Sequence, residues 1–241
     1  MKLNQPMLFD NATGDMFLDI FDSMPVRELE AGEVLIHAGS SANQIFNIVD
    51  GTLMVSRIGM DGRRQVLSFL FRNNFVGLSA TNQYFFSVEA VTTAKITYCN
   101  RYILEDRLAK DPEADRAFRN MVFRVLENSL DLVYSLGQRT AVERLAVFLL
   151  YLRNRHMYSA ELSETSPKLA TISLPMTRQD IADFLGLKKE TVSRIFTLLD
   201  KNGLIDRKHS SSVEVTDLAR LRQLAGIQDF ASPLRVASRS K

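Results

Sequence analysis

Residues 177–202 read TRQDIADFLGLKKETVSRIFTLLDKN, and the apolar residues of this stretch recur at helical spacing. In the first half, Ile181 and Leu185 are four residues apart. The second half carries one apolar stripe, formed by Val192, Ile195, Phe196 and Leu199. Between the halves lies Gly186, which can adopt a positive φ in a tight turn, and Ala182 is small enough for two helices to cross closely. The stretch therefore predicts a helix-turn-helix.

The second predicted helix has a polar face opposite its apolar stripe. This face is formed by Glu190, Ser193, Arg194 and Thr197. A short helix with hydrogen-bonding side chains on its outer face can enter the major groove of DNA and contact base edges. The structural alternative is a pair of ordinary amphipathic helices whose outer face is polar only because it is exposed to solvent.

A β-hairpin is predicted directly after these helices. The short runs Leu204-Ile205 and Val213-Glu214-Val215 flank a polar turn at residues 210–212. A hairpin in this place is the wing of a winged helix, which rests on the phosphate backbone. The basic residues available there are Arg207, Lys208 and His209.

Length and charge predict a chain in two parts. The 241 residues suffice for two domains and a connecting element. Residues 1–138 carry 13 Lys and Arg against 17 Asp and Glu, whereas residues 139–241 carry 17 against 11. Because nucleic-acid affinity depends on neutralising phosphates, a basic part beside an acidic part is expected of a DNA-binding regulator.

The location is predicted from features that the sequence lacks. No apolar run approaches the ~20 residues that span a bilayer, and the N-terminal residues do not read as a signal peptide. The single cysteine, Cys99, excludes an internal disulfide and is expected to be a small core residue. We therefore expect a cytoplasmic protein that has no membrane partner.

The N-terminal part is predicted to be an antiparallel β-roll, sandwich or barrel. Short β-rich runs lie at residues 34–36, 45–49, 53–58, 66–71, 88–91 and 96–98, with glycine-containing turns between them. A short amphipathic helix is expected before them at residues 16–21. Such a scaffold commonly holds a ligand, although many are only packed cores.

A long helix is predicted over residues 109–138. Its heptad seam consists of Phe118, Val122, Val125, Ser129, Leu132 and Leu136. A stripe this wide needs two partners, namely the chain's own roll and a second copy of the helix. The alternative is a helix that packs only on its own domain. Further elements are expected as a helix at 139–155, a loop at 156–168, a strand at 170–174, a helix from 216 or 217 to about 225, and a disordered tail.

Four motifs carry a resemblance to a known family. They are DGRRQV at 61–66, AVERLA at 141–146, TRQDIA at 177–182 and ETVSR at 190–194. With the order of the elements, they make the chain resemble the CRP/FNR superfamily of bacterial transcription regulators, and within it the FixK branch of the FNR-type group.

The resemblance implies an α+β fold. An N-terminal antiparallel β-roll, a jelly roll like that of cyclic-nucleotide-binding domains, would occupy residues 1–108. A dimerisation helix would follow at 109–138, a C-terminal winged helix-turn-helix at 139–226 and a basic tail at 227–241.

The resemblance also implies a homodimeric activator that binds double-stranded DNA at an inverted repeat of TTGA type and contacts RNA polymerase. The implied base-reading residues are Glu190, Ser193 and Arg194. Contacts to the DNA backbone are expected from Thr177, Arg178, Gln179, Lys188, Lys189, Arg207 and Lys208. The polymerase contact is expected around Arg64, Arg72 and Asn73.

Three departures from the family pattern bear on ligands and capping. The Gly-Glu and Arg-Ser pairs that hold a cyclic nucleotide are missing, since Gly77 precedes Leu78 and Phe85-Phe86-Ser87 stands where the arginine is expected. One cysteine cannot hold an iron-sulfur cluster. Lys188 replaces the Thr or Ser that usually opens the second helix, at a cost of ~1 kcal/mol unless a phosphate lies close by.

Two alternative functions stay open from the sequence. One is a haem- or small-molecule-gated sensor of the same superfamily, with an apolar cavity near Phe75, Phe85 and Phe86. The other is a cupin-like enzyme with an attached helix-turn-helix, which needs a cluster of His and carboxylate ligands. The roll contains only His37. We therefore expect no metal site, no cofactor and no catalytic residues.

Overall fold

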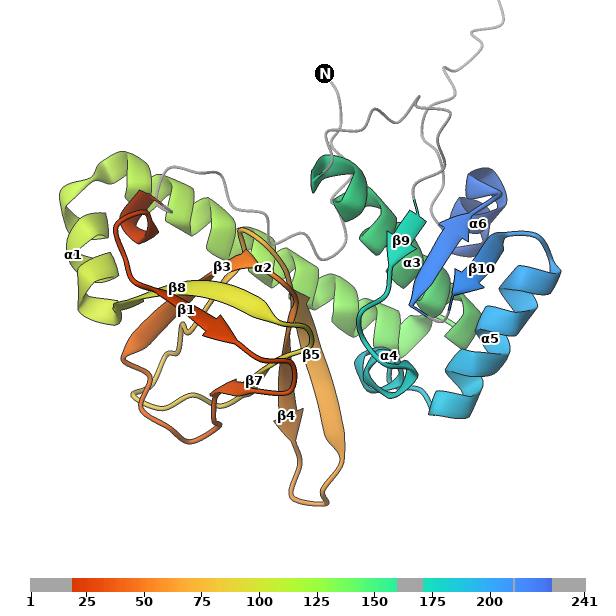
Figure 1. The fold of residues 1–241 in the computed structure, drawn as a ribbon, viewed down its shortest axis with the longest axis horizontal. Helices are drawn as coiled ribbons and strands as arrows, with labels where there is room; N and C mark the ends of the chain where they lie inside the picture. The colour runs from red at the N-terminus through yellow and green to blue at the C-terminus, as the bar shows by residue number, and fades with distance from the viewer. Residues whose placement is uncertain (1–18, 160–170, 210, 227–241) are drawn as a thin grey trace, which may run out of the picture.

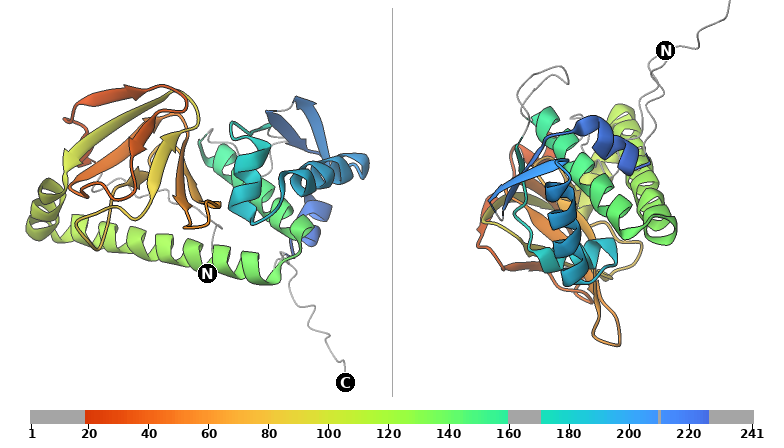
Figure 2. Two further views of the ribbon diagram at one scale, coloured as in Figure 1. Left: turned by 90° about the horizontal axis from the view of Figure 1, so that it is seen from below. Right: turned by 90° about the vertical axis from the view of Figure 1, so that its right-hand side faces the viewer.

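The computed structural model describes residues 19–159, 171–209 and 211–226. A β-roll forms one end of the molecule and a helical part with a small sheet forms the other (Figure 1). The long helix α2 (Pro112–Gln138) runs along the roll and reaches the C-terminal part, as Figure 2 shows from two further sides. The predicted α+β order of roll, long helix and winged helix is confirmed.

The roll consists of two four-stranded antiparallel sheets. In one sheet the order is β1 (Val26–Leu29), β8 (Ala94–Asn100), β3 (Gln44–Asp50) and β6 (Phe75–Val76). In the other it is β2 (Val34–Ile36), β7 (Ser87–Ala90), β4 (Leu53–Ile58) and β5 (Arg64–Leu70). Apolar side chains from both sheets meet between them, among them Ile48, Leu53, Val88 and Ile96. Alternating inward residues therefore build the core, as expected for packed sheets.

All six predicted runs of the roll form strands, and three further elements were not predicted. Strands β1 and β6 have four and two residues, and only Leu29 of β1 is buried. Helix α1 (Arg101–Lys110) buries only Leu104, so its sequence lacks a clear apolar stripe. The predicted helix at 16–21 appears as one turn of 3-10 helix at 19–21, and residues 16–18 lie outside the described residues.

Helix α2 begins at a capping residue and packs one face on its own chain. Asp111 accepts hydrogen bonds from the amides of Glu113 and Ala114, and Pro112 occupies the first turn. Helix α1 lies before it, where the sequence predicted no helix. Ala114, Met121 and Ser135 of α2 are buried.

Helix α3 (Ala141–Ser159) is longer than predicted. The prediction of a loop from His156 is wrong, because the helix continues to Ser159. Residues 156–159 contain no glycine or proline that would end it. The remaining predicted loop residues, 160–168, and the predicted disordered tail, 227–241, lie outside the described residues.

The C-terminal part is a winged helix-turn-helix. After β9 (Thr171–Ser173) come α4 (Arg178–Leu185) and α5 (Lys189–Lys201), then β10 (Ile205–His209), β11 (Ser212–Val215) and α6 (Leu218–Leu224). The three strands form an antiparallel sheet in the order β10, β11, β9. The predicted hairpin and the helix that follows it are confirmed.

A shared apolar core joins the roll to the C-terminal part. Phe69 of β5 packs on Phe148 of α3 and Phe184 of α4, with ring centroids 6.0 and 5.4 Å apart. Val66 and Met54 of the roll belong to the same buried cluster. The periodicity of the sequence did not predict this contact between the domains.

The outer face of α2 carries large apolar side chains that the described chain leaves exposed. They are Val122, Phe123, Val125, Leu126, Leu130, Val133 and Tyr134. This set, the outer face of α2, only partly overlaps the predicted seam. Phe118 packs on Phe75 of the roll, Leu132 packs on the C-terminal core, and Leu136 lies against Gly186. Val122, Val125 and Ser129 of the predicted seam are exposed.

Candidate DNA-binding interface

Helix α5 separates its core residues from its polar residues. Val192, Ile195, Phe196 and Leu199 are buried, as the sequence predicted. Glu190, Ser193 and Arg194 are exposed on the opposite side. Thr197 is half-buried and its Oγ1 donates to the carbonyl of Ser193, 3.1 Å away. The three predicted base-reading residues therefore share one accessible face.

Helix α4 is fixed at its start by a capping box. Thr177 Oγ1 accepts from the amide of Asp180 at 3.1 Å, and the carboxylate of Asp180 accepts from the amide of Thr177 at 2.9 Å. The hydroxyl of Thr177 also donates to Asp180 Oδ2 at 2.6 Å. Thr177, expected at the DNA backbone, therefore caps α4 with its hydroxyl turned toward its own helix.

The turn between the helices requires glycine. Gly186 ends α4 in the left-handed region, at φ 63° and ψ 40°. A Cβ on this residue would lie 3.2 Å from Leu136 Cδ2 and 3.5 Å from Arg144 Nη1. Both the backbone conformation and the close approach of α2 therefore favour glycine here.

Lys188 opens α5 without capping it. Its backbone is extended, at φ −86° and ψ 147°, and its side chain makes no capping hydrogen bond. The exposed lysine lies beside exposed Lys189 at the helix N-terminus. Two positive charges at the positive end of a helix dipole are unfavourable unless an anion is bound there.

The other residues predicted to contact the DNA backbone differ in the contacts that they make within the chain. Gln179 is exposed and donates to Asp183 Oδ1 at 2.6 Å. Arg207 pairs with Asp200 at 3.0 Å. The side chain of Lys208, on β10, lies outside the described residues.

Arg178 lies over the ring of Phe196, with its guanidinium carbon 3.6 Å from the ring centroid. Burial lowers the pKa of Arg178, and the positive charge of Arg207 lowers it further. Arg178 therefore packs as well as carries charge, which the sequence did not indicate.

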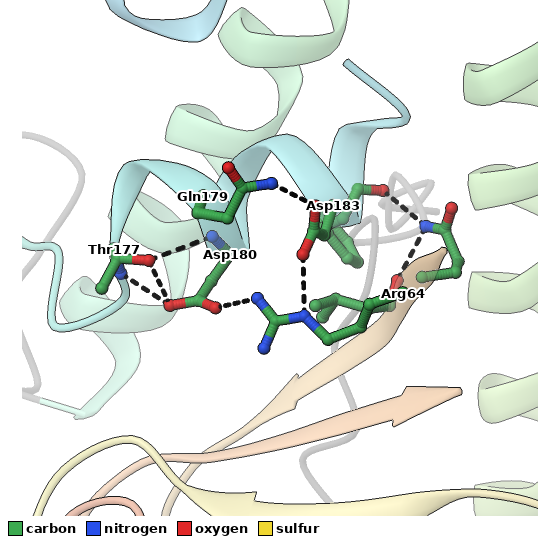
Figure 3. A network of polar contacts seen from close by, with 8 residues as sticks. Arg64, Thr177, Gln179, Asp180 and Asp183 are labelled. Atoms are coloured by element: carbon green, nitrogen blue, oxygen red, sulfur yellow. Dashed lines mark hydrogen bonds and ion pairs between the residues drawn. The ribbon is translucent and has the colours of Figure 1, made fainter. Parts of the chain in front are cut away.

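The surface predicted to contact polymerase divides into two parts. Arg72 and Asn73 are exposed, and Asn73 has a positive φ of 64°, which asparagine tolerates better than other non-glycine residues. Arg155 of α3 donates to the carbonyl of Arg72 at 2.9 Å. The placement of Arg64 on an exposed surface is wrong. Its side chain is turned toward α4, where it forms ion pairs with Asp180 and Asp183 (Figure 3).

The three phenylalanines expected near an apolar ligand cavity are divided between the roll core and its surroundings. Phe86 is buried in the roll core and packs on Tyr84, with ring centroids 5.8 Å apart. Phe85 is 57% exposed and Phe75 packs on Phe118 outside that core. Phe85 also packs edge-on against Phe86, with ring centroids 5.0 Å apart, whereas Phe75 packs against a separate cluster that includes Leu104 and Met121.

The residues present do not fit a cyclic nucleotide. No Lys or Arg occurs between Arg72 and Lys95, so a buried phosphate in this part of the roll would lack its cation. Aromatic side chains fill the core there instead. A Cβ on Gly77 would lie 2.5 Å from the carbonyl oxygen of Gln44, so this glycine serves close backbone packing.

Groups that could bind metal or react are sparse in the described part of the chain. Residues 19–159, 171–209 and 211–226 contain no group of three or more His, Cys, Asp or Glu placed to hold a metal ion. Cys99 is buried, and burial raises the pKa of its thiol. None of the described helices is both long and apolar enough to cross a membrane.

Two arginines outside the helix-turn-helix, Arg64 and Arg144, hold α4, and their spacing in the sequence did not indicate this role. Arg144 donates to the carbonyl of Leu185 at 3.0 Å and to that of Leu136 at 2.6 Å. It therefore ties the end of α4 to the end of α2. The motif AVERLA pointed to Arg144 as a family mark without showing its contacts, and no local signal pointed to the pairing of Arg64.

Comparisons with known proteins agree with this geometry. A model of the Crp-like helix-turn-helix domain matches residues 143–224, and a model of the cyclic nucleotide-binding domain matches residues 26–111. The nitrogen fixation regulation protein FixK of Bradyrhizobium diazoefficiens is 31% identical over 213 residues, which cover 85% of this chain and 87% of that protein. The transcriptional activator protein FnrL of Cereibacter sphaeroides is 31% identical over 200 residues, which cover 83% and 80%. The solved structure of FixK2 from Bradyrhizobium japonicum aligns with a TM-score of 0.75 at 27% identity, covering 87% of this chain and 99% of that one.

Proposed function

Since the chain belongs to the CRP/FNR family of DNA-binding transcription regulators, we propose that it is a homodimeric activator that binds an inverted repeat of TTGA type. The observation that carries the proposal is the exposed face of α5, which presents Glu190, Ser193 and Arg194 together. The buried residues of α4 and α5 pack on the core, so this face stays outside.

The chemistry of the three residues supports this site. An arginine can pair with O6 and N7 of guanine, and a carboxylate can accept from N4 of cytosine. A serine hydroxyl or methylene can meet a neighbouring thymine. Arg194 and Glu190 together would therefore read the G·C pair of the half-site, and Ser193 would contact the adjacent thymine.

Contacts to phosphates would surround this face. Lys188 and Lys189 stand exposed at the N-terminus of α5, where a phosphate would offset the missing cap and the unfavourable dipole. Thr177, Arg178 and Gln179 would contribute from the start of α4. The wing would contribute through Arg207 and Lys208.

The dimer would form through the outer face of α2. Seven large apolar side chains on one side of a helix are more than a monomer usually exposes together. The hydroxyl of Ser129 already donates to the carbonyl of Val125 at 2.8 Å, so it would not enter the contact unpaired. A two-fold axis along α2 would then impose inverted symmetry on the DNA site.

DNA binding would need neither cyclic AMP nor an iron-sulfur cluster. The stretch between Arg72 and Lys95 offers no cation for a buried phosphate, and one cysteine cannot hold a cluster. The roll would instead support the regulator structurally and offer Arg72 and Asn73 to RNA polymerase. The roll would end at residue 108, the dimerisation helix at 138 and the winged helix-turn-helix at 226. The protein would be cytoplasmic.

Selection of DNA sites by protein purified without added ligand tests the proposal. We expect enrichment of TTGA half-sites in inverted orientation, about one helical turn apart. Enrichment of direct repeats or single sites would contradict the dimer. Enrichment only after cyclic AMP is added would contradict the ligand-independent part.

A further inference from the structure

Arg64 of β5 connects the roll to the first helix of the helix-turn-helix by two ion pairs. Its Nε lies 2.7 Å from Asp183 Oδ2 and its Nη2 lies 2.5 Å from Asp180 Oδ1. Figure 3 shows the guanidinium reaching across from the strand to both carboxylates of α4. The partners are separated by 119 and 116 residues in the sequence, so the contact joins two parts of the fold.

The pairs are sheltered from solvent. The side chain of Arg64 is 28% exposed, and those of Asp180 and Asp183 are 12% and 13% exposed. Burial lowers the pKa of Arg64, but its bonds to Asp183 and Asp180 raise it by more, so the net pKa is raised. An arginine fork that pairs two carboxylates at low exposure fixes geometry better than an exposed pair does.

The two carboxylates also organise the residues expected at the DNA backbone. Asp180 holds the cap at Thr177, and Asp183 accepts from Gln179 at 2.6 Å. At the other end of α4, Arg144 binds the carbonyls of Leu185 and Leu136. Helix α4 is thus held at its start by the roll and at its end by the dimerisation helix.

We propose that Arg64 is a positioning residue for DNA recognition, which clamps α4, and with it α5, in a fixed orientation to the roll and α2. The proposal rests on the proposed function, because two recognition helices of a dimer must lie a fixed distance apart to reach two half-sites. In this chain the internal ion pairs of Arg64 hold that orientation.

A comparison of Arg64 with its neighbour Arg63 distinguishes the clamp from a simple effect of charge. Its neighbour Arg63 pairs with Asp61 within the same hairpin, and its side chain is 88% exposed. Arg63→Ala removes the same charge without touching α4, so it is a matched control. Asp183→Asn removes a negative charge from the other side of the clamp and leaves the capping box intact.

The test measures affinity for inverted repeats whose half-sites are one helical turn apart, or closer or farther by one and two base pairs. Wild-type protein and Arg63→Ala should share a strong preference for one spacing. In Arg64→Ala and in Asp183→Asn, the ratio of affinities between the preferred spacing and the other spacings should fall at least about tenfold. Their general effects on affinity should be opposite in sign, since one variant loses a positive charge and the other a negative one.

An unchanged spacing preference in Arg64→Ala and Asp183→Asn would overturn the clamp. Hydrogen exchange of the DNA-free protein gives a second reading, with faster exchange across α4 expected in Arg64→Ala but not in Arg63→Ala. If the wild type selects no inverted repeat, the proposed function fails. Exchange then still decides the clamp, because equal exchange in the two variants would refute it.

Discussion

Leu126→Ala should weaken the dimer strongly. Leu126 lies in the middle of the outer face of α2 and is 54% exposed in the protomer. Truncating a fully packed leucine costs about 2–5 kcal/mol. About half of the side chain is exposed in the protomer and would be buried only by a partner, so roughly half of this cost, ~1–2.5 kcal/mol, would fall on the dimer contact. Because the two-fold axis places the substitution in both protomers, the cost to the dimer doubles to ~2–5 kcal/mol. This raises the dimer dissociation constant ~30-fold to ~4,000-fold.

Sedimentation over a range of protein concentrations measures this change as a shift of the monomer–dimer midpoint. Val26→Ala is the control, since Val26 is 61% exposed but lies on edge strand β1 rather than on α2. The helical signal in circular dichroism should stay the same for both variants. A Leu126→Ala protein that dimerises as tightly as wild type would refute the assignment of this face.

Three further predictions concern the ligand, the DNA backbone and the polymerase. Cyclic AMP should give no binding heat in calorimetric titration, and a micromolar dissociation constant would contradict the assignment of the roll as a packed core. Lys188→Ala should weaken binding to all DNA sequences alike and lower the slope of log affinity against log salt by about one. Arg72→Ala and Asn73→Ala should reduce transcription in a purified system while DNA affinity stays unchanged. Equal loss of both would count against a polymerase contact.

The helix-turn-helix could be predicted because its core is local. Ile181 and Leu185, and the stripe from Val192 to Leu199, recur at the helical period, so the burial of α4 and α5 follows from a few neighbouring residues.

The periodicity of α2 did not show which face meets which partner. Both its flanks are apolar, because one packs on the chain's own domains and the other stays exposed. A heptad count ranks Phe118 and Leu132 with Val125, although the first two contact their own chain. Only the placement of the roll and of the C-terminal part separates them.

The contacts of Arg64 and Arg144 could not be predicted from spacing. Arg64 meets partners more than 100 residues away, and an ion pair of this range leaves no periodic signal. The expected polymerase contact placed Arg64 on the surface with Arg72 and Asn73, whereas its neighbour Arg63 is the one that is exposed. Arg63 belongs to the turn before β5 and pairs with Asp61, whereas Arg64 is the first residue of β5 and pairs with α4.

The central claim is tested most directly by measuring how well Arg194→Ala distinguishes two DNA sites. One is a TTGA inverted repeat, and the other is the same repeat with its guanine replaced. Arg194 is exposed on the reading face of α5, and a bidentate pair with guanine provides about 1–3 kcal/mol of discrimination. The proposed reading predicts that Arg194→Ala binds the two repeats with nearly equal affinity, while the wild type prefers the first by roughly 5-fold to 150-fold per half-site. Full preference retained by Arg194→Ala would show that this face of α5 does not read the base.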